Sequence, residues 1–79
     1  MKIEILMPSL SPTMEEGSLA KWYVKPGDSV QPGDILADIE TDKALMEYES
    51  AEEGKVVELL VTEGAENIKI NTAIAILEV

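Results

Sequence analysis

The chain has 79 residues, enough for one domain, and six Lys against sixteen Asp and Glu give it a formal net charge of −10. It contains neither Cys nor His, which excludes disulfides, soft-ligand zinc or copper sites, and nucleophilic catalysis by a Cys or a Ser–His pair. The charge disfavours nucleic acid and anionic membranes as partners, and no segment reads as a signal peptide or membrane span, so we expect a soluble, acidic, intracellular monomer.

Closely spaced glycines and prolines divide the chain into short segments, which predict strands and leave no room for a long helix. A very short strand is expected at Ser29–Val30, between two Pro-Gly-Asp triplets at 26–28 and 32–34 that have Pro and Gly where a type II turn requires them. Longer β-branched or aliphatic runs predict the other strands: 3–7, 18–24, 35–41, 44–50, 55–61 and 72–79. This spacing favours a single all-β domain over residues 1–79, either a sandwich or a barrel.

The first half of the chain resembles the second at an offset of 37 residues, which brings Gly17 onto Gly54. A Glu-Glu pair precedes both glycines, and a shared pattern follows them: Leu19 with Val56, Trp22 with Leu59, Val24 with Val61, and Gly27 with Gly64. The repeat predicts two sheets related by pseudo-twofold symmetry around one core, to which these apolar residues belong. The Trp22 ring is expected between the sheets, where its N–H needs a partner. The match weakens at 67–71, which lack a Pro-Gly-Asp triplet.

Residues 34–50 predict a hairpin with Asp42 and Lys43 as the two central residues of its turn. In that register one face of the hairpin is apolar and the other mostly acidic, whereas a shift by one residue mixes the two faces. The expected pairs are Thr41–Ala44, Ile39–Met46 and Ala37–Tyr48 on the apolar face, and Glu40–Leu45, Asp38–Glu47 and Leu36–Glu49 on the other. A type I turn is expected, because Asp-Lys is not a dipeptide that type I′ turns prefer.

The predicted hairpin presents the amine of Lys43 to water at the apex of a rigid support, as a lysine that carries a covalent cofactor would require. A lysine next to Glu40 and Asp42 at a hairpin tip is usually an ordinary surface residue that makes weak ion pairs. Hairpin geometry alone leaves both interpretations open.

Three stretches of the sequence together resemble lipoyl domains of pyruvate dehydrogenase dihydrolipoyl acetyltransferases. They are Met7-Pro8-Ser9-Leu10-Ser11-Pro12-Thr13-Met14-Glu15-Glu16-Gly17; Val30 with Gly33-Asp34 and Ile39-Glu40-Thr41-Asp42-Lys43-Ala44; and the later glycines Gly54 and Gly64. The resemblance covers essentially the whole chain. It implies a flattened β-barrel or barrel-sandwich hybrid of two four-stranded antiparallel sheets, with the termini opposite the lysine. It also implies that Lys43 carries lipoic acid as an amide, N6-lipoyllysine.

The resemblance implies that lipoyl-Lys43 is a swinging arm serving three active sites, because no side chain of the domain supplies the chemistry. A thiamine-diphosphate-dependent 2-oxo acid dehydrogenase, here for pyruvate, would acylate it, in part by reading the loop 8–16. An acyltransferase core would pass the acetyl group to coenzyme A, and dihydrolipoyl dehydrogenase would reoxidise the arm. The isolated domain would catalyse no reaction by itself. It would be part of a dihydrolipoyllysine-residue acetyltransferase or of a dehydrogenase β-subunit, and a flexible linker is expected after Val79. The compartment would be a bacterial cytoplasm or a mitochondrial matrix.

The residues beside the lysine are expected to guide its modification. By resemblance, Asp42 and Ala44 help a lipoate ligase or lipoyl transferase to recognise Lys43, whereas biotinyl domains place Met on both sides of their lysine. Glu40 and Glu47 are candidates for ligase or partner recognition, with an ordinary solvated acidic surface as the alternative. An autonomous enzyme and an unmodified interaction module remain competing readings, and modification of Lys43 distinguishes the carrier from the latter.

Overall fold

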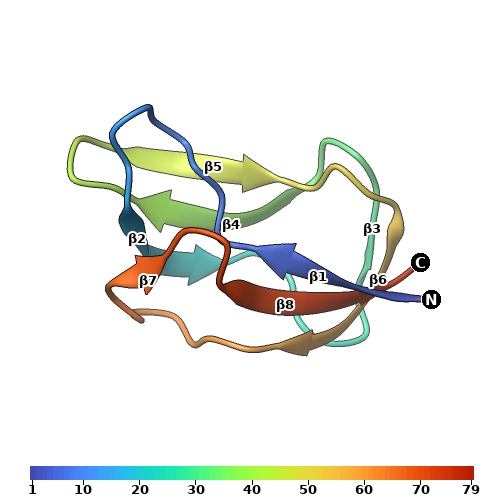
Figure 1. Ribbon diagram of the computed structural model, residues 1–79. Coiled ribbons are helices and arrows are strands. Elements are labelled where there is room, and N and C mark those ends of the chain that lie inside the picture. The colour runs from blue at the N-terminus through green and yellow to red at the C-terminus, as the bar shows by residue number, and fades with distance from the viewer.

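The computed structural model describes residues 1–79 as eight strands without a helix. The strands are β1 (Lys2–Leu6), β2 (Glu16–Trp22), β3 (Ser29–Val30), β4 (Ile35–Glu40), β5 (Leu45–Glu49), β6 (Gly54–Leu59), β7 (Ile68–Lys69) and β8 (Ala73–Glu78). They form two four-stranded antiparallel sheets in the orders β1-β8-β6-β3 and β5-β4-β2-β7, which enclose one core (Figure 1). The all-β prediction and the short strand β3 are confirmed. The structure holds no helix that could cross a lipid bilayer.

The pairing order of the sheets shows the predicted duplication. Each strand of the first half corresponds to the strand four places later in the chain: β1 to β5, β2 to β6, β3 to β7 and β4 to β8. Exchanging the strands of each pair converts the order of the first sheet into that of the second. The β1–β8 and β4–β5 ladders correspond in this scheme, and each contains a bulge, between Ile5 and Leu6 in one and between Ile35 and Ala37 in the other. The pseudo-twofold arrangement is therefore confirmed down to a shared irregularity.

The turns repeat as well, with different residues in the two halves. Gly27 and Gly33 adopt φ values of 99° and 94°, as the third position of the predicted type II turns requires. Where the first half has Gly33, the second half has Asn71 with φ 71°, and Asn tolerates this left-handed region better than most residues. Each turn is closed by one backbone hydrogen bond: Asp28 to Lys25 at 3.0 Å, Asp34 to Gln31 at 3.0 Å, and Thr72 to Lys69 at 3.1 Å.

The core lies between the sheets and consists of thirteen buried apolar residues. Leu19 and Val56, paired by the repeat, are fully enclosed, as predicted. The other expected core residues are only partly buried and pack against its edge: Trp22, Val24, Leu59 and Val61. The Trp22 ring is therefore only partly buried rather than enclosed between the sheets, and its Nε1–H donates to the Val61 carbonyl at 2.9 Å, which supplies the partner it was expected to need.

The chain termini and the β4–β5 turn lie at opposite ends of a molecule that measures 32 × 21 × 19 Å (Figure 1). Met1 and Val79 are hydrogen-bonded to each other, and the amino terminus also contacts Glu78 at 3.3 Å. This placement agrees with the expectation that the termini lie away from Lys43. Neighbouring chain attached at either terminus would leave the turn unobstructed.

Candidate functional site

The β4–β5 hairpin forms in the predicted register. The ladder pairs Ala37 with Tyr48, Asp38 with Glu47, Ile39 with Met46, and Glu40 with Leu45. Beyond the last pair, the Thr41 N–H donates to the Ala44 carbonyl at 2.9 Å, so Asp42 and Lys43 form the bend. Alternation of buried and exposed residues therefore identified the turn correctly.

One predicted pair of this hairpin is wrong. Glu49 pairs with Ile35 rather than with Leu36, because the ladder contains a bulge between Ile35 and Ala37. The extra residue interrupts the alternation, so Leu36 and Ala37 both point into the core, and Leu36 is only 2% exposed. The bulge ends the acidic outer face at Asp38 and strengthens the attachment of β4 to the core.

The turn itself is held by the Thr41 hydroxyl, which the sequence analysis did not single out. Neither Asp42 nor Lys43 has a positive φ, which excludes type I′ geometry. The expected type I bond from the Ala44 N–H to the Thr41 carbonyl is absent. Instead, Thr41 Oγ1 accepts from the Ala44 N–H at 3.1 Å and from the Lys43 N–H at 3.2 Å, and donates to the Ala44 carbonyl at 3.0 Å. A Thr directly before a two-residue turn is the signal for such a motif.

The amine of Lys43 has no partner within the protein. The residue is exposed and its side chain makes no hydrogen bond, and the only ion pair in the structure joins the amino terminus to Glu78. The weak ion pairs with Glu40 and Asp42, considered from sequence, do not form. The amine is therefore free to react with an incoming group and to move on its four-carbon stem.

The surface beside Lys43 is acidic. Asp42, Glu40 and Glu47 are all exposed, and so is Ala44, the other neighbour of the lysine. The like-charge pair of Asp38 and Glu47 is eased by the Tyr23 hydroxyl, which donates to Asp38 Oδ2 at 2.8 Å. That hydrogen bond, followed by desolvation and the two nearby carboxylates, raises the pKa of Tyr23. The four predicted recognition residues thus share one end of the molecule with the lysine.

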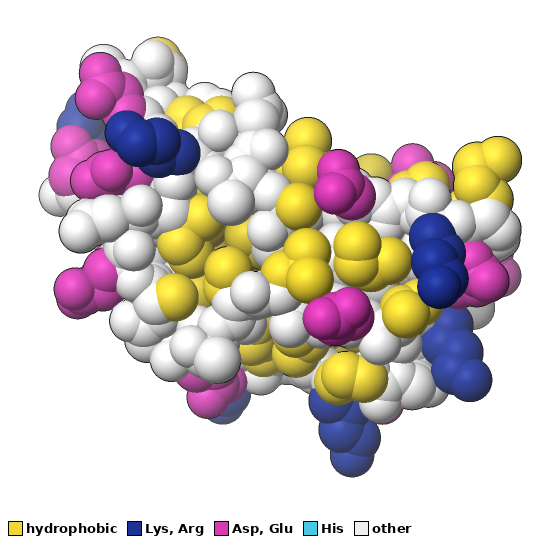
Figure 2. Space-filling view, turned by 60° about the horizontal axis from the view of Figure 1, so that its bottom comes forward, with side chains coloured by type: hydrophobic (Ala, Val, Ile, Leu, Met, Phe, Trp, Pro, Cys, Tyr) yellow, Lys and Arg dark blue, Asp and Glu magenta, His cyan; other side chains and the backbone are white.

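The opposite sheet has a different outer surface. Figure 2, which views the molecule from the side of β6 and β8, shows hydrophobic side chains gathered across the face with a few acidic ones among them. Exposed Leu6, Val57 and Leu60 belong to this half of the molecule. The backbone is pseudo-twofold symmetric, but the face in Figure 2 is mainly hydrophobic whereas the hairpin that bears Lys43 exposes mainly acidic residues.

The loop between β1 and β2 lies beside the Lys43 turn. A shallow depression of about 270 Å³ lies between the loop and the hairpin, and Asp42 lines it together with Thr13 and Met14. Asp42 also lines a second depression, of about 220 Å³, between the turn and the start of β2. Buried Met14 anchors the loop, since its sulfur accepts from the Leu10 N–H at 3.3 Å and its N–H donates to the Ser11 carbonyl at 3.2 Å. The loop and the turn therefore lie side by side although Met14 and Asp42 are 28 positions apart in sequence (Figure 1).

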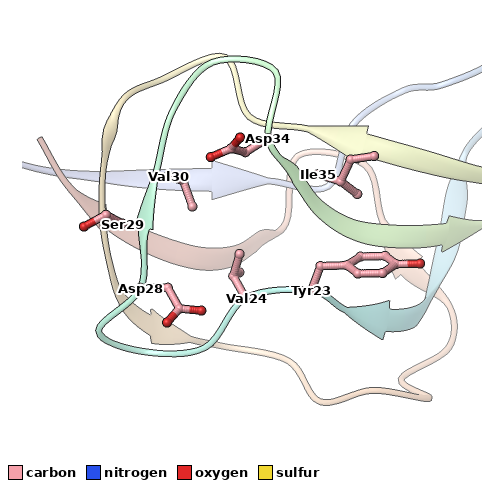
Figure 3. Close-up of a pocket in the computed structure, with 7 residues that line it drawn as sticks. All are labelled: Tyr23, Val24, Asp28, Ser29, Val30, Asp34 and Ile35. Atoms are coloured by element: carbon pink, nitrogen blue, oxygen red, sulfur yellow. The ribbon is translucent and has the colours of Figure 1, made fainter.

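The largest depression, about 390 Å³, lies elsewhere, between the strand ends near β3 (Figure 3). Its two carboxylates already have local partners: Asp28 accepts from the Lys25 N–H at 3.0 Å and Asp34 from the Gln31 N–H at 2.9 Å. They fix the two Pro-Gly-Asp turns. No group of carboxylates in the structure is arranged to hold a metal ion.

Comparisons with known proteins agree with this geometry. The family model Biotin_lipoyl, described as "Biotin-requiring enzyme", matches residues 3–77. The chain is 58% identical over 77 residues to the dihydrolipoyllysine-residue acetyltransferase component of the pyruvate dehydrogenase complex of Zymomonas mobilis, covering 98% of the chain and 18% of that protein. It is 57% identical over 77 residues to the pyruvate dehydrogenase E1 component subunit beta of Rhizobium meliloti, covering 98% and 17%.

A solved structure extends the agreement to the fold. The lipoyl domain of the 2-oxoglutarate dehydrogenase complex from Azotobacter vinelandii superposes with a TM-score of 0.73 at 30% identity, over 96% of each chain. The chain spans less than a fifth of the two longer relatives, so the similarity concerns one domain of each. The chain belongs to the biotin and lipoyl domain family and, within it, is a lipoyl domain.

Proposed function

We propose that this domain carries acyl groups on a lipoyl group attached to Lys43, within a pyruvate dehydrogenase complex. The observation that carries the proposal is the unpaired amine of Lys43 at the apex of a hairpin whose strands are tied into the core. Support for the cofactor and the complex comes from the similarity to a lipoyl domain and to two components of that complex.

In the attachment step a ligase first activates the carboxyl group of lipoate. Lys43 Nζ, after losing a proton, then forms an amide bond with the carboxyl carbon, and the activating group leaves. One positive charge is lost from a chain that already has a net charge of −10. The dithiolane then supplies the acyl-accepting and electron-accepting chemistry that this chain lacks, having no Cys and no His. The amine's role is to bind the arm covalently and to let it swing.

The partners follow from this role. A thiamine-diphosphate-dependent pyruvate dehydrogenase would load the arm with an acetyl group. An acyltransferase core would move the acetyl group to coenzyme A, and dihydrolipoyl dehydrogenase would restore the disulfide. We infer an intracellular setting for the domain. Near-equal identity to an acetyltransferase component and to an E1 β-subunit is consistent with either parent, and both belong to the same complex.

We propose that Glu40, Asp42, Ala44 and Glu47 contribute to recognition of the lysine by the ligase and of the loaded arm by the dehydrogenase. Their exposure around one turn supports this role. Asp42 also lines the depression beside the β1–β2 loop, so a partner that contacts the turn can reach both segments.

Mass spectrometry of the intact chain tests the proposal. The chain is incubated with a lipoate ligase, lipoate and ATP, as wild type, as Lys43→Gln and as Lys55→Gln, which removes an exposed lysine from β6 as a matched control. Wild type and Lys55→Gln should each gain one lipoyl increment and Lys43→Gln none. An increment that survives Lys43→Gln rejects the site, and no increment on the wild type favours an unmodified interaction module.

A further inference from the structure

The Thr41 side chain is fully engaged within the turn that presents Lys43. A hydroxyl offers one donor and two acceptor positions. In Thr41 the donor is directed to the Ala44 carbonyl, and the acceptors receive the N–H groups of Lys43 and Ala44, at 3.0, 3.2 and 3.1 Å. No other side chain hydrogen-bonds to the backbone of residues 41–44.

We propose that Thr41 is a positioning residue for lipoylation: its hydroxyl holds the backbone of Lys43 in the geometry that the modifying enzyme binds. The inference rests on the proposed function and adds a residue that does not touch the reacting atoms. Thr41 acts through the main chain, since the Lys43 N–H is one of its partners and the Lys43 amine is not.

Removal of the hydroxyl would loosen the turn without opening the hairpin. The Lys43 and Ala44 N–H groups are exposed and would bond to water, and the Thr41 N–H to Ala44 carbonyl bond at 2.9 Å would still close the turn. The ladder from Glu40–Leu45 inward does not involve the hydroxyl. Two turn residues would regain backbone freedom, and the ligase would have to order them on binding.

Two substitutions separate the hydroxyl from the shape of the side chain. Thr41→Val keeps the β-branched shape and deletes the hydroxyl, whereas Thr41→Ser keeps the hydroxyl and deletes the methyl. Thr62→Val is a matched control, because Thr62 precedes another turn and its side chain makes no hydrogen bond. All three are compared with the wild type in steady-state lipoylation, amide hydrogen exchange and thermal unfolding.

We expect Thr41→Val to lower kcat/KM for lipoylation about tenfold, mostly through KM, because the interaction lost is one that orders the bound substrate. Amide exchange should accelerate at Lys43 and Ala44 and not in β4 or β5, while the unfolding temperature stays close to that of the wild type. Thr41→Ser should have the kcat/KM of the wild type and the same slow amide exchange at Lys43 and Ala44. Thr62→Val should behave as the wild type in all three measurements.

Wild-type lipoylation kinetics in Thr41→Val would overturn the role of Thr41, and so would a Thr41→Ser variant as slow as Thr41→Val. A loss in Thr41→Val with unchanged exchange at Lys43 and Ala44 would also overturn it. These results leave the carrier proposal intact as long as the wild type is lipoylated. A wild type that takes up no lipoyl group would instead reject the carrier function itself.

Discussion

Met1 and Val79 exchange two backbone hydrogen bonds, at 3.1 and 2.7 Å, at the position where the pseudo-twofold symmetry places the counterpart of the Lys43 turn. The Lys2–Glu78 pair before them corresponds to Glu40–Leu45. One end of the molecule thus has a two-residue turn with the carrier lysine, and the equivalent end has the two chain termini. This relationship explains why the termini and Lys43 lie at opposite ends of the molecule (Figure 1).

Joining Val79 to Met1 through an Asn-Gly dipeptide should close the β1–β8 ladder as a second hairpin, since Asn-Gly favours two-residue hairpin turns. The cyclic chain should gain about 2–4 kcal/mol in free energy of unfolding, because closure removes entropy from the unfolded chain. Urea unfolding measures the gain against a linear chain with the same dipeptide appended. Equal midpoints for the two chains would show that the termini are not spaced as described.

Gly54→Ala should destabilise the domain more than Gly17→Ala, although the repeat makes the two glycines equivalent. A Cβ at Gly54 would lie 2.6 Å from the Glu78 carbonyl oxygen, and the backbone of β8 would have to move. At Gly17 the nearest atom is Met14 Cε at 2.7 Å, the end of a flexible side chain. We expect a cost of about 2–3 kcal/mol for Gly54→Ala and a smaller one for Gly17→Ala, from denaturant unfolding. The reverse order would contradict this account of the β6–β8 contact.

Leu36→Ala tests the bulge in β4. With Leu36 buried in the core, the substitution should cost about 2–5 kcal/mol of unfolding free energy. In the regular register predicted from sequence, Leu36 would lie on the acidic outer face and its loss would cost less than about 0.5 kcal/mol. Chemical denaturation decides between these two values, with exposed Leu45→Ala as the control that should be nearly neutral.

The fold and the site differed in how far the sequence could predict them. Period-two alternation places the turn at Asp42 and Lys43, because a one-residue shift would pair Ile39 with Leu45 and mix the apolar and acidic faces. The bulge at Leu36 is not predicted, because Ile35, Leu36 and Ala37 are three apolar residues in a row and fit a regular strand as well as a bulged one. Residue identity does not mark Asn71 as the equivalent of Gly33, because the two share a backbone conformation and not a residue type, and the offset of 37 places Gly33 on Ile70 instead.

For the site, too, the sequence predicts features that depend on neighbouring residues better than features that depend on the folded chain. The position of Lys43 at a turn came from the hairpin pattern, whereas its role came from family resemblance. The side-chain bonds of Thr41 depend on its rotamer, for which a Thr directly before a two-residue turn is only a general signal. The proximity of the β1–β2 loop to Asp42 is a tertiary contact between segments that no strand pairing joins, and it became visible only in the folded chain.

Stability should fall at alkaline pH through Tyr48. Burial raises the pKa of its phenol above the ordinary value of 10.0, and its hydroxyl donates to the Leu6 carbonyl at 3.2 Å. The folded chain therefore holds this proton more tightly than the unfolded chain, so the contribution is complete below pH 10.0 and is lost as pH rises through the folded pKa. Tyr48→Phe should flatten the decline in unfolding midpoint at alkaline pH. An unchanged decline would assign the effect to other groups.

Peptide mass mapping of the ligase-treated wild-type chain tests the central claim most directly, because it locates the lipoyl group among six lysines of one molecule. The increment should fall entirely on the peptide that contains Lys43. An increment on Lys21, Lys55 or any other lysine, or a uniform spread over several of them, would contradict the claim that the β4–β5 turn presents the carrier amine.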